Sequence, residues 1–340
     1  MTVFRKKDKQ PWNFLTEIIN MKQHNILITS AGKRVVLTRA FKDTLAKYDS
    51  KAKVYTTDTN PKMAPAGYVS DECIQVPRCT ADNYVELLLQ ICKEKSIGLI
   101  IPTIDTELLI LAINRLKFEE LGVVVSVPSM DFVAICRDKR NTGQFLEAHG
   151  IRIPAEVDKY NPVFPLFAKP YDGSLSANLH YITKPEELTD DILNDPKLLF
   201  MEYIDKKVYK EYTVDMYYGA DNELKCLVPR ERIEIRAGEI NKGCTHKGKL
   251  MEYLKKRMSH IEGCVGCICL QVFYNPETED VVGIEINPRF GGGYPQSYAA
   301  GANFPELLIR EYFGKEKIEY FEDWKDNLIM LRYDDAIFVG

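Results

Sequence analysis

The first third of the chain alternates short apolar runs with longer segments of helical periodicity, and this alternation restricts the fold more than any other feature. Strands separated by helices form a parallel sheet, because parallel neighbours need a long crossover connection. We therefore predict a Rossmann-like lobe. Its expected strands are 25–29, 53–57, 98–102 and 123–127, and its expected helices are 33–47, 82–95 and 105–119.

Two turns of this lobe lie where parallel sheets bind ligands. The turn at 30–34 reads Ser-Ala-Gly-Lys-Arg and has one glycine where a dinucleotide site needs three, so we do not expect NAD binding. Thr103, Asp105 and Glu107 follow the third strand, whose carboxyl end faces the ligand crevice. Contact with a second substrate is one interpretation of these three residues. Capping of the next helix is the alternative that we favour.

A predicted hairpin between residues 266 and 293 is the second constraint. Two runs rich in Val, Ile, Cys and aromatic residues flank a turn-forming cluster centred near Thr278. Gln271 then lies directly across from Glu285. Asn287 points to the same face as Glu285, because side chains alternate along a strand.

One carboxylate and two amide oxygens on one face suit a hard divalent cation. Mg²⁺ fits best, because it completes its octahedron with substrate phosphates and water, and Mn²⁺ is an alternative. Arg289 follows the strand and would lie where phosphate oxygens approach the metal. A solvated polar face is the competing interpretation. Gln271 favours the metal site, because it interrupts an apolar run and a buried amide needs partners.

Gln271, followed by Glu285 and Asn287 in Glu-Ile-Asn-Pro-Arg, resembles the metal-binding signature of the ATP-grasp superfamily. The resemblance is narrower to proteins similar to the large subunit of carbamoyl-phosphate synthase, and it extends from His24 to about Tyr312. It implies a fold class of α/β and α+β, with a Rossmann-like pre-ATP-grasp domain followed by a two-lobed ATP-grasp domain. The implied divisions are an N-terminal extension at 1–23, the pre-ATP-grasp domain at 24–135, the ATP-grasp domain at 136–315 with lobes at 136–204 and 205–315, and a C-terminal tail at 316–340.

The resemblance also implies where ATP binds. Lys139, in a helix that we expect from Cys136 to His149, and Lys169, at the end of an expected strand at 163–170, match the phosphate-binding positions of the family. A lysine at the end of a buried strand costs free energy unless an anion pairs with it. For Lys139, a solvated charge cluster is the alternative. The implied nucleotide-binding set is Lys139, Lys169, Asp172, Ser174, Met201, Glu202, Tyr203, Ile204 and Glu211. In it, backbone groups of Met201 and Ile204 would read adenine, and Glu211 would bind ribose.

The implied activity is that of an ATP-dependent carboxylate-amine ligase, which forms an amide or peptide bond through an acyl-phosphate intermediate. Lys169 and Arg289 would offset charge on the transferred phosphoryl group, and Arg230 or Lys242 would orient the acyl phosphate. A solvated strand face explains Arg230 and Lys242 equally well. Two other functions are a carbamoyl-phosphate synthase-type subunit that needs a partner and a non-catalytic ATP- or metabolite-binding protein.

Composition narrows the class of protein further. The net charge is -4 at pH 7, and no long basic run follows the first residues, which argues against nucleic acid as a partner. No apolar run approaches the length of about 18 residues that spans a bilayer, and no signal-peptide core is present. We therefore expect a cytoplasmic protein, without a membrane partner, that acts on a small-molecule carboxylate and amine, and leave a homo-oligomer open. We expect Cys264, Cys267 and Cys269 to be buried core residues rather than zinc ligands.

Overall fold

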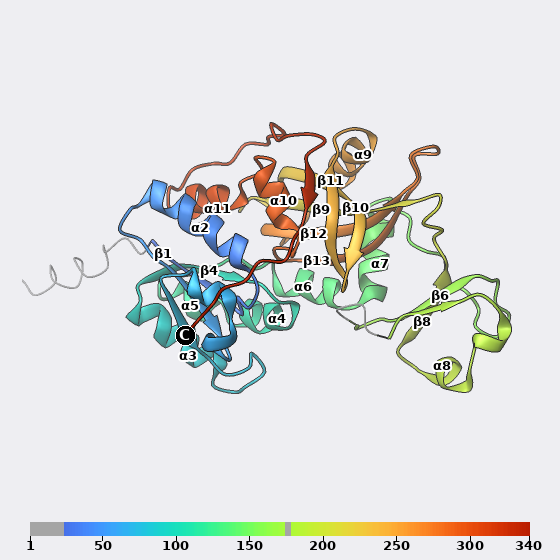
Figure 1. The fold of residues 1–340 in the computed structure, drawn as a ribbon, viewed down its shortest axis with the longest axis horizontal. Coiled ribbons are helices and arrows are strands. Elements are labelled where there is room, and N and C mark those ends of the chain that lie inside the picture. Colours follow the sequence, from blue (N-terminus) through green and yellow to red (C-terminus); the bar gives the residue numbers. More distant parts are fainter. Residues whose placement is uncertain (1–23, 174–177) are drawn as a thin grey trace, which may run out of the picture.

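Three sheets organise residues 24–173 and 178–340, which are the part of the chain that the computed structural model describes (Figure 1). A five-stranded parallel sheet comes first, and a three-stranded and a six-stranded antiparallel sheet follow. This succession confirms the predicted fold class of a Rossmann-like lobe followed by a two-lobed α+β part. The boundaries at 135 and 315 stay predictions.

The parallel sheet has the order β3-β2-β1-β4-β5. Its strands are β1 (Asn25–Thr29), β2 (Val54–Asp58), β3 (Glu72–Gln75), β4 (Ile97–Pro102) and β5 (Val124–Val125). The helices around it are α2 (Val35–Tyr48), α3 (Tyr84–Glu94), α4 (Asp105–Ile113), α5 (Arg115–Glu119) and α6 (Met130–Arg137). All four predicted strands form, and the sequence analysis missed β3. The helix predicted at 105–119 is divided at Asn114, whose side-chain amide donates to the carbonyl oxygen of Ile110 at 2.9 Å.

The helix that we expected to begin at Cys136 begins three residues later. Cys136 belongs to the end of α6, and the next helix is α7 (Lys139–Ala148). Asp138 separates the two helices with an extended backbone, and its carboxylate accepts the backbone N–H of Arg140 at 2.9 Å. This is the geometry of an N-cap, so Lys139 occupies the first helical position.

The six-stranded sheet has the order β13-β12-β9-β10-β11-β14. Its strands are β9 (Lys210–Tyr218), β10 (Leu224–Arg236), β11 (Glu239–Thr245), β12 (Gly266–Tyr274), β13 (Val281–Asn287) and β14 (Ile329–Leu331). The hairpin register was predicted correctly, because Gln271 pairs with Glu285. Helices α9 (Lys249–Arg257), α10 (Tyr294–Ala299) and α11 (Phe304–Tyr312) accompany this sheet. Helix α10 begins with proline at its second position.

The three-stranded sheet has the order β7-β6-β8 and lies apart from the other two sheets (yellow-green in Figure 1). Its strands are β6 (Leu166–Pro170), β7 (His180–Ile182) and β8 (Leu198–Glu202), and α8 (Asp190–Asn194) lies beside it. A small separate core of Leu166, Ala168 and Phe200 holds the sheet together.

The main hydrophobic core joins the parallel sheet to the six-stranded sheet. It runs from Ile26 and Phe41 to Leu270 and Phe290, and the rings of Phe41 and Phe290 meet edge to face at 5.7 Å. Helix α2 lies beside α10 and α11 at this junction (Figure 1). The cysteines at 264, 267 and 269 are buried, as predicted. None of the helices within the described ranges is long and apolar enough to cross a membrane.

Candidate functional site

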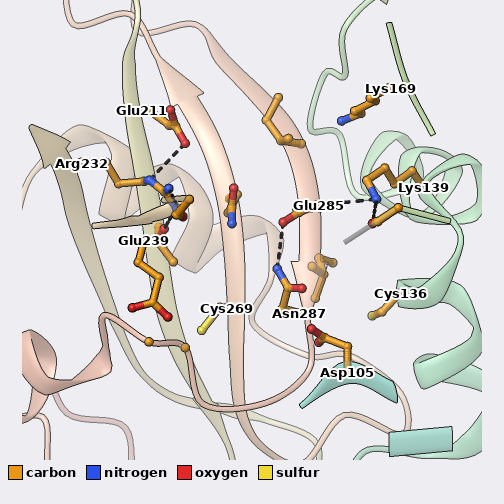
Figure 2. Close-up of a pocket in the computed structure, with 18 of the residues that line it drawn as sticks. Asp105, Cys136, Lys139, Lys169, Glu211, Arg232, Glu239, Cys269, Glu285 and Asn287 are labelled. Carbon is orange, nitrogen blue, oxygen red and sulfur yellow. Dashed lines mark hydrogen bonds and ion pairs between the residues drawn. The ribbon is translucent and has the colours of Figure 1, made fainter. Parts of the chain in front are cut away.

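A cavity of about 840 Å³ opens where the three sheets meet (Figure 2). Its wall includes residues of the α4, α6 and α7 helices, of the small sheet and of the hairpin β12–β13. The predicted site residues that line it are Lys139, Lys169, Met201, Glu202, Tyr203, Ile204, Glu211, Arg230, Gln271, Glu285, Asn287 and Arg289. Residues far apart in the sequence are therefore brought to one cavity.

The hairpin presents its three predicted metal ligands to the cavity. Gln271 and Glu285 are opposite one another in the ladder, and the amide nitrogen of Asn287 donates to Oε1 of Glu285 at 3.0 Å. All three side chains are half-buried rather than buried, because they face the cavity. One carboxylate with two amides is an oxygen donor set that fits Mg²⁺ completed by phosphate oxygens.

Two lysines face this hairpin from the opposite wall (Figure 2). Nζ of Lys139 lies 3.9 Å from Oε2 of Glu285 and donates to the carbonyl oxygen of Gly173 at 2.5 Å. Lys169, only 8% exposed, is the last residue but one of β6. Burial, and to a smaller extent the charge of Lys139, lower the pKa of Lys169 from 10.5 to about 8 against the attraction of Glu285. We call Lys139, Lys169, Glu285 and Asn287 the hairpin end of the cavity.

The segment predicted to read adenine ends β8 and continues beyond it. The carboxylate of Glu202 accepts from the guanidinium of Arg152 and from the backbone N–H of Ala155 at 3.0 Å. Arg152 also binds Asp280 of the hairpin loop at 3.0 Å. The carboxylate of Glu202 is thus already bound by Arg152 and Ala155 of the protein itself. Tyr203 and Ile204 follow the strand and line the cavity with their neighbours.

Glu211, the predicted ribose ligand, is held by two cations. Its carboxylate lies 3.1 Å from Nε of Arg232 and 3.0 Å from Nζ of Lys206 (Figure 2). Arg232 also donates to the carbonyl oxygen of Gly238 at 2.9 Å. Arg232 and Lys206 thus fix the position of the Glu211 carboxylate. Its role in binding ribose stays a prediction.

The structure leaves two predicted residues, Asp172 and Lys242, outside the cavity. Asp172 accepts from Lys197 at 2.8 Å and does not line the cavity. Lys242 is exposed, 2.6 Å from Glu234, and is also absent from the cavity wall. The reason is local: each side chain points to a partner of opposite charge at the surface. Ser174 lies outside the described residues.

Arg230 lies in the cavity wall, but it is tied to a buried partner. The side chains of Arg230 and Asp215 are 1% and 0% exposed, and Nε and Nη2 of Arg230 donate to the two carboxylate oxygens at 2.7 and 3.0 Å. Ser297 adds a hydroxyl donor to Asp215 at 2.6 Å. Burial opposes the charge of Arg230, but Asp215 overcomes this effect and raises the pKa of Arg230.

The glycine loop 291–293 packs flat against this arginine. A Cβ added at Gly293 would lie 2.3 Å from Nη1 of Arg230, and one added at Gly292 would lie 2.6 Å from Oε1 of Glu239. Only glycine fits at such distances. We call the wall formed by Arg34, Asp105, Arg230, Glu239, Arg289 and the loop 291–293 the glycine-loop end of the cavity.

Sequence reasoning missed Arg34 and Glu239 in this wall and treated Asp105 mainly as a helix cap. Asp105 binds Nη2 of Arg289 at 2.7 Å across the two lobes. Glu107 does cap: it is fully buried and accepts the backbone N–H of Thr103 at 2.9 Å. The signal for Arg34 was its turn after β1, since strand carboxyl ends face the ligand crevice.

The fold consists of a parallel sheet followed by two antiparallel sheets. They surround a cavity lined by lysines and oxygen ligands, which is an arrangement suited to a phosphate-bearing ligand. Two family models match the chain: the PylC-like N-terminal domain over residues 26–126, and the ATP-grasp in the biosynthetic pathway with Ter operon over residues 194–334. The chain therefore belongs to the ATP-grasp superfamily of ATP-dependent ligase-type enzymes. No curated protein matches it significantly.

Solved structures share the fold at low sequence identity. The biotin carboxylase domain of Hydrogenobacter thermophilus 2-oxoglutarate carboxylase is 14% identical, with a TM-score of 0.69 over 90% of this chain and 73% of that one. N5-carboxyaminoimidazole synthetase of Staphylococcus aureus is 16% identical, with a TM-score of 0.68 over 88% and 79%. L-amino acid ligase of Bacillus licheniformis is 15% identical, with a TM-score of 0.62 over 85% and 74%.

Proposed function

We propose that the protein is an ATP-dependent carboxylate-amine ligase. A carboxylate oxygen of one substrate attacks the γ-phosphorus of ATP, the bond from that phosphorus to ADP breaks, and an acyl phosphate forms. The amine of the second substrate then attacks the acyl carbon. Phosphate leaves with the electron pair of the broken C–O bond, the amine proton passes to solvent, and an amide remains.

The observation that carries this proposal is the hairpin end of the cavity. Glu285 and Asn287 face Lys139 and the buried Lys169, so oxygen ligands for a cation and cations for phosphates are set against each other. A lysine as buried as Lys169 favours an anion beside it, because its ammonium has lost most of its hydration. A triphosphate with its metal supplies both missing charges.

The relatives support the same assignment. The Hydrogenobacter thermophilus domain was solved with MgADP, ADP and bicarbonate, and the Staphylococcus aureus synthetase was solved with ADP. The relative from Bacillus licheniformis is named as an L-amino acid ligase. We transfer ATP and Mg²⁺ to this chain on these grounds together with the donor set of the hairpin.

Each residue then has a specific task. Gln271, Glu285 and Asn287 would hold Mg²⁺, which would offset the negative charge of the phosphates. Lys139 and Lys169 bind the phosphates and orient the transferred group. Arg289 follows Pro288 and lines the cavity. Its guanidinium offsets the negative charge that develops on the transferred phosphoryl group.

The test is release of ADP and phosphate from ATP and Mg²⁺ with pooled amino acids and small carboxylates. We expect release that depends on one pool and falls at least about 100-fold in Glu285→Gln, because even outer ligands of metal sites contribute about 10–100-fold. Glu277→Gln is the matched control, since Glu277 is an exposed carboxylate of the same hairpin.

Two results would contradict the proposal. Wild-type turnover by Glu285→Gln removes the metal role of this carboxylate. ATP binding by calorimetry without ADP release in any pool, for a protein that is folded, removes the ligase and leaves a nucleotide-binding protein.

A further inference from the structure

The glycine-loop end of the cavity contains charges that are mostly matched in pairs. Within residues 24–173 and 178–340, two of its guanidinium groups, and that of the neighbouring Arg332, each have a carboxylate oxygen within 3 Å. The pairs are Arg230 with Asp215 at 2.7 Å, Arg289 with Asp105 at 2.7 Å, and Arg332 with Glu239 at 2.7 Å. A further cation at this end would therefore carry a positive charge that no close carboxylate of the described chain balances.

Arg34 is that further cation. Its nearest carboxylate in the described chain is Glu239 at 3.9 Å, and Glu239 already pairs with Arg332. The side chain of Arg34 is 20% exposed and lines the cavity. Burial lowers the pKa of Arg34, and the charge of Arg289 lowers it further. An anion beside Arg34 would offset both effects.

Gly292 makes room for this guanidinium. A Cβ at Gly292 would lie 2.8 Å from Nη1 of Arg34, so a larger residue would require this guanidinium to shift from its position. The guanidinium is planar, and two of its N–H groups can donate parallel hydrogen bonds to the two oxygens of a carboxylate. The wall is thus shaped for an oxyanion at Arg34.

A hydrogen-bond acceptor without a partner lies at the same end. Oδ2 of Asp105 binds Arg289, but Oδ1 is buried and has no partner among the described residues. Asp105 is close enough to Arg34 to act on its charge. Nη1 of Arg230, in a side chain 1% exposed, is likewise without a partner in the described chain and adds an unused donor.

We infer that Arg34 and Asp105 form a subsite for an α-amino carboxylate, with the carboxylate on Arg34 and the ammonium on the carboxylate of Asp105, whose side chain is 25% exposed and lines the cavity. An α-amino acid is the small group that carries an anion and a cationic donor a few ångströms apart. The subsite adjoins Arg289, two residues after Asn287, so its occupant reaches the hairpin end. This inference rests on the proposed function, and it specifies that one ligase substrate is an amino acid.

The test measures binding rather than turnover. The full-length protein is saturated with Mg²⁺ and the non-hydrolysable analogue AMP-PNP. A panel of L- and D-α-amino acids is ranked by thermal shift, and the best one is titrated by calorimetry against the carboxylic acid of the same length without the amino group. We expect the amino acid to bind at least about tenfold more tightly, because a charge-assisted hydrogen bond contributes about 1.5–3 kcal/mol and tenfold corresponds to about 1.4.

Variants assign the effect to the two residues. Arg34→Gln and Asp105→Asn are each expected to weaken amino acid binding at least about tenfold, and Arg34→Gln is expected to leave AMP-PNP affinity within about twofold of wild type. Arg39→Gln is the matched control, because Arg39 is an exposed arginine on helix α2, which Arg34 directly precedes. It should bind the amino acid as wild type does.

Several outcomes overturn the subsite. One is equal binding of the amino acid and the acid without an amino group, and another is wild-type binding by Arg34→Gln. A third is that inorganic phosphate binds as tightly as any amino acid, and a fourth is that no amino acid binds up to about 10 mM, above the usual range of substrate KM values. In each case normal AMP-PNP binding and Glu285-dependent ADP release would leave the proposed function intact.

Discussion

The two ends of the cavity have similar basic and acidic side chains, but these charges are far less closely paired at the hairpin end than at the glycine-loop end. At the hairpin end, the nearest pair of opposite charges, Lys139 and Glu285, is 3.9 Å apart, and Lys169 has no carboxylate within ion-pair distance in the described chain. At the glycine-loop end, Arg230 and Asp215 make two bonds of 2.7 and 3.0 Å. Both ends are built from long basic side chains that face acidic ones.

Within the described residues, Lys169 at the hairpin end lacks a charged partner until a ligand binds, whereas Arg230 at the glycine-loop end stabilises the fold. Arg230 is saturated on one side by Asp215, so removing it leaves an uncompensated carboxylate in the core. Lys169 is buried without such a partner, so the protein is less stable for its presence than it would be with an apolar side chain. A ligand that carries negative charge reverses the balance for Lys169 only.

The largest expected effect is on stability at the glycine-loop end. Arg230→Met should lower the free energy of unfolding by about 3–5 kcal/mol, because Asp215 stays buried as an unpaired charge. Urea unfolding followed by circular dichroism measures it. Arg236→Met, at the exposed end of the same strand, should change stability by less than about 0.5 kcal/mol. If both variants unfold at the same urea concentration, Arg230 is not structural.

Lys169→Met should have effects of opposite sign on stability and on binding. The shift of the pKa of Lys169 from 10.5 to about 8 corresponds to as much as about 3 kcal/mol at about 1.36 kcal/mol per unit, so removing the charge should stabilise the protein without nucleotide. The affinity for ATP should fall about tenfold or more, because a charge-assisted contact to phosphate is lost. Urea unfolding and calorimetry give the two numbers. A variant that binds ATP as wild type does would place the phosphates elsewhere.

The sequence predicted the features that depend on local pattern. The alternation of strands and helices predicted four of the parallel strands, and the spacing of the hairpin about Thr278 predicted the pairing of Gln271 with Glu285. Period and turn chemistry are properties of neighbouring residues, so a single sequence contains them. The order of the motifs then indicated the superfamily, which the family models confirm.

Contacts between distant segments could not be predicted in this way. The partners of Arg289 and Arg230 come from positions 184 and 15 residues away, and nothing in the local pattern marks Asp105 or Asp215 as those partners. The same limit explains Lys242, which lies two residues after the buried Ile240 but meets Glu234 at the surface. Tertiary packing decides which charges of an amphipathic strand face a cavity.

The pH dependence of nucleotide affinity tests whether Lys169 is the unpaired group at the hairpin end that the phosphates need. Without nucleotide, Lys169 has a pKa of about 8, and phosphate oxygens favour its charged form. Below pH 8 the ammonium is already protonated and affinity should be flat; above pH 8 binding must take up a proton, and affinity should fall by up to about tenfold per pH unit. Calorimetry at pH 9 in buffers of different ionisation enthalpy should detect this uptake.

Folding should respond to the same group with the opposite slope. Because the pKa of Lys169 is lower in the folded protein than in the unfolded chain, the unfolded chain binds more protons between pH 8 and 10.5. The share of stability that depends on Lys169 is therefore lowest below pH 8 and rises through this window. Lys169→Met should lack both slopes, and a variant that keeps the affinity slope would assign it to another group.

The smallest effect is expected for Lys242, and it tests whether cavity position decides function. Its Nζ lies 2.6 Å from Glu234 on an exposed part of the sheet, and such surface pairs contribute about 0–1 kcal/mol. Lys242→Ala should therefore change the free energy of unfolding by less than about 1 kcal/mol and leave ADP release within about twofold of wild type. Glu234→Ala is the matched partner variant. A loss of ADP release in Lys242→Ala but not in Glu234→Ala would mean that the β10–β11 hairpin brings this lysine to the substrate during turnover, and the division of the cavity into two ends would have to include it.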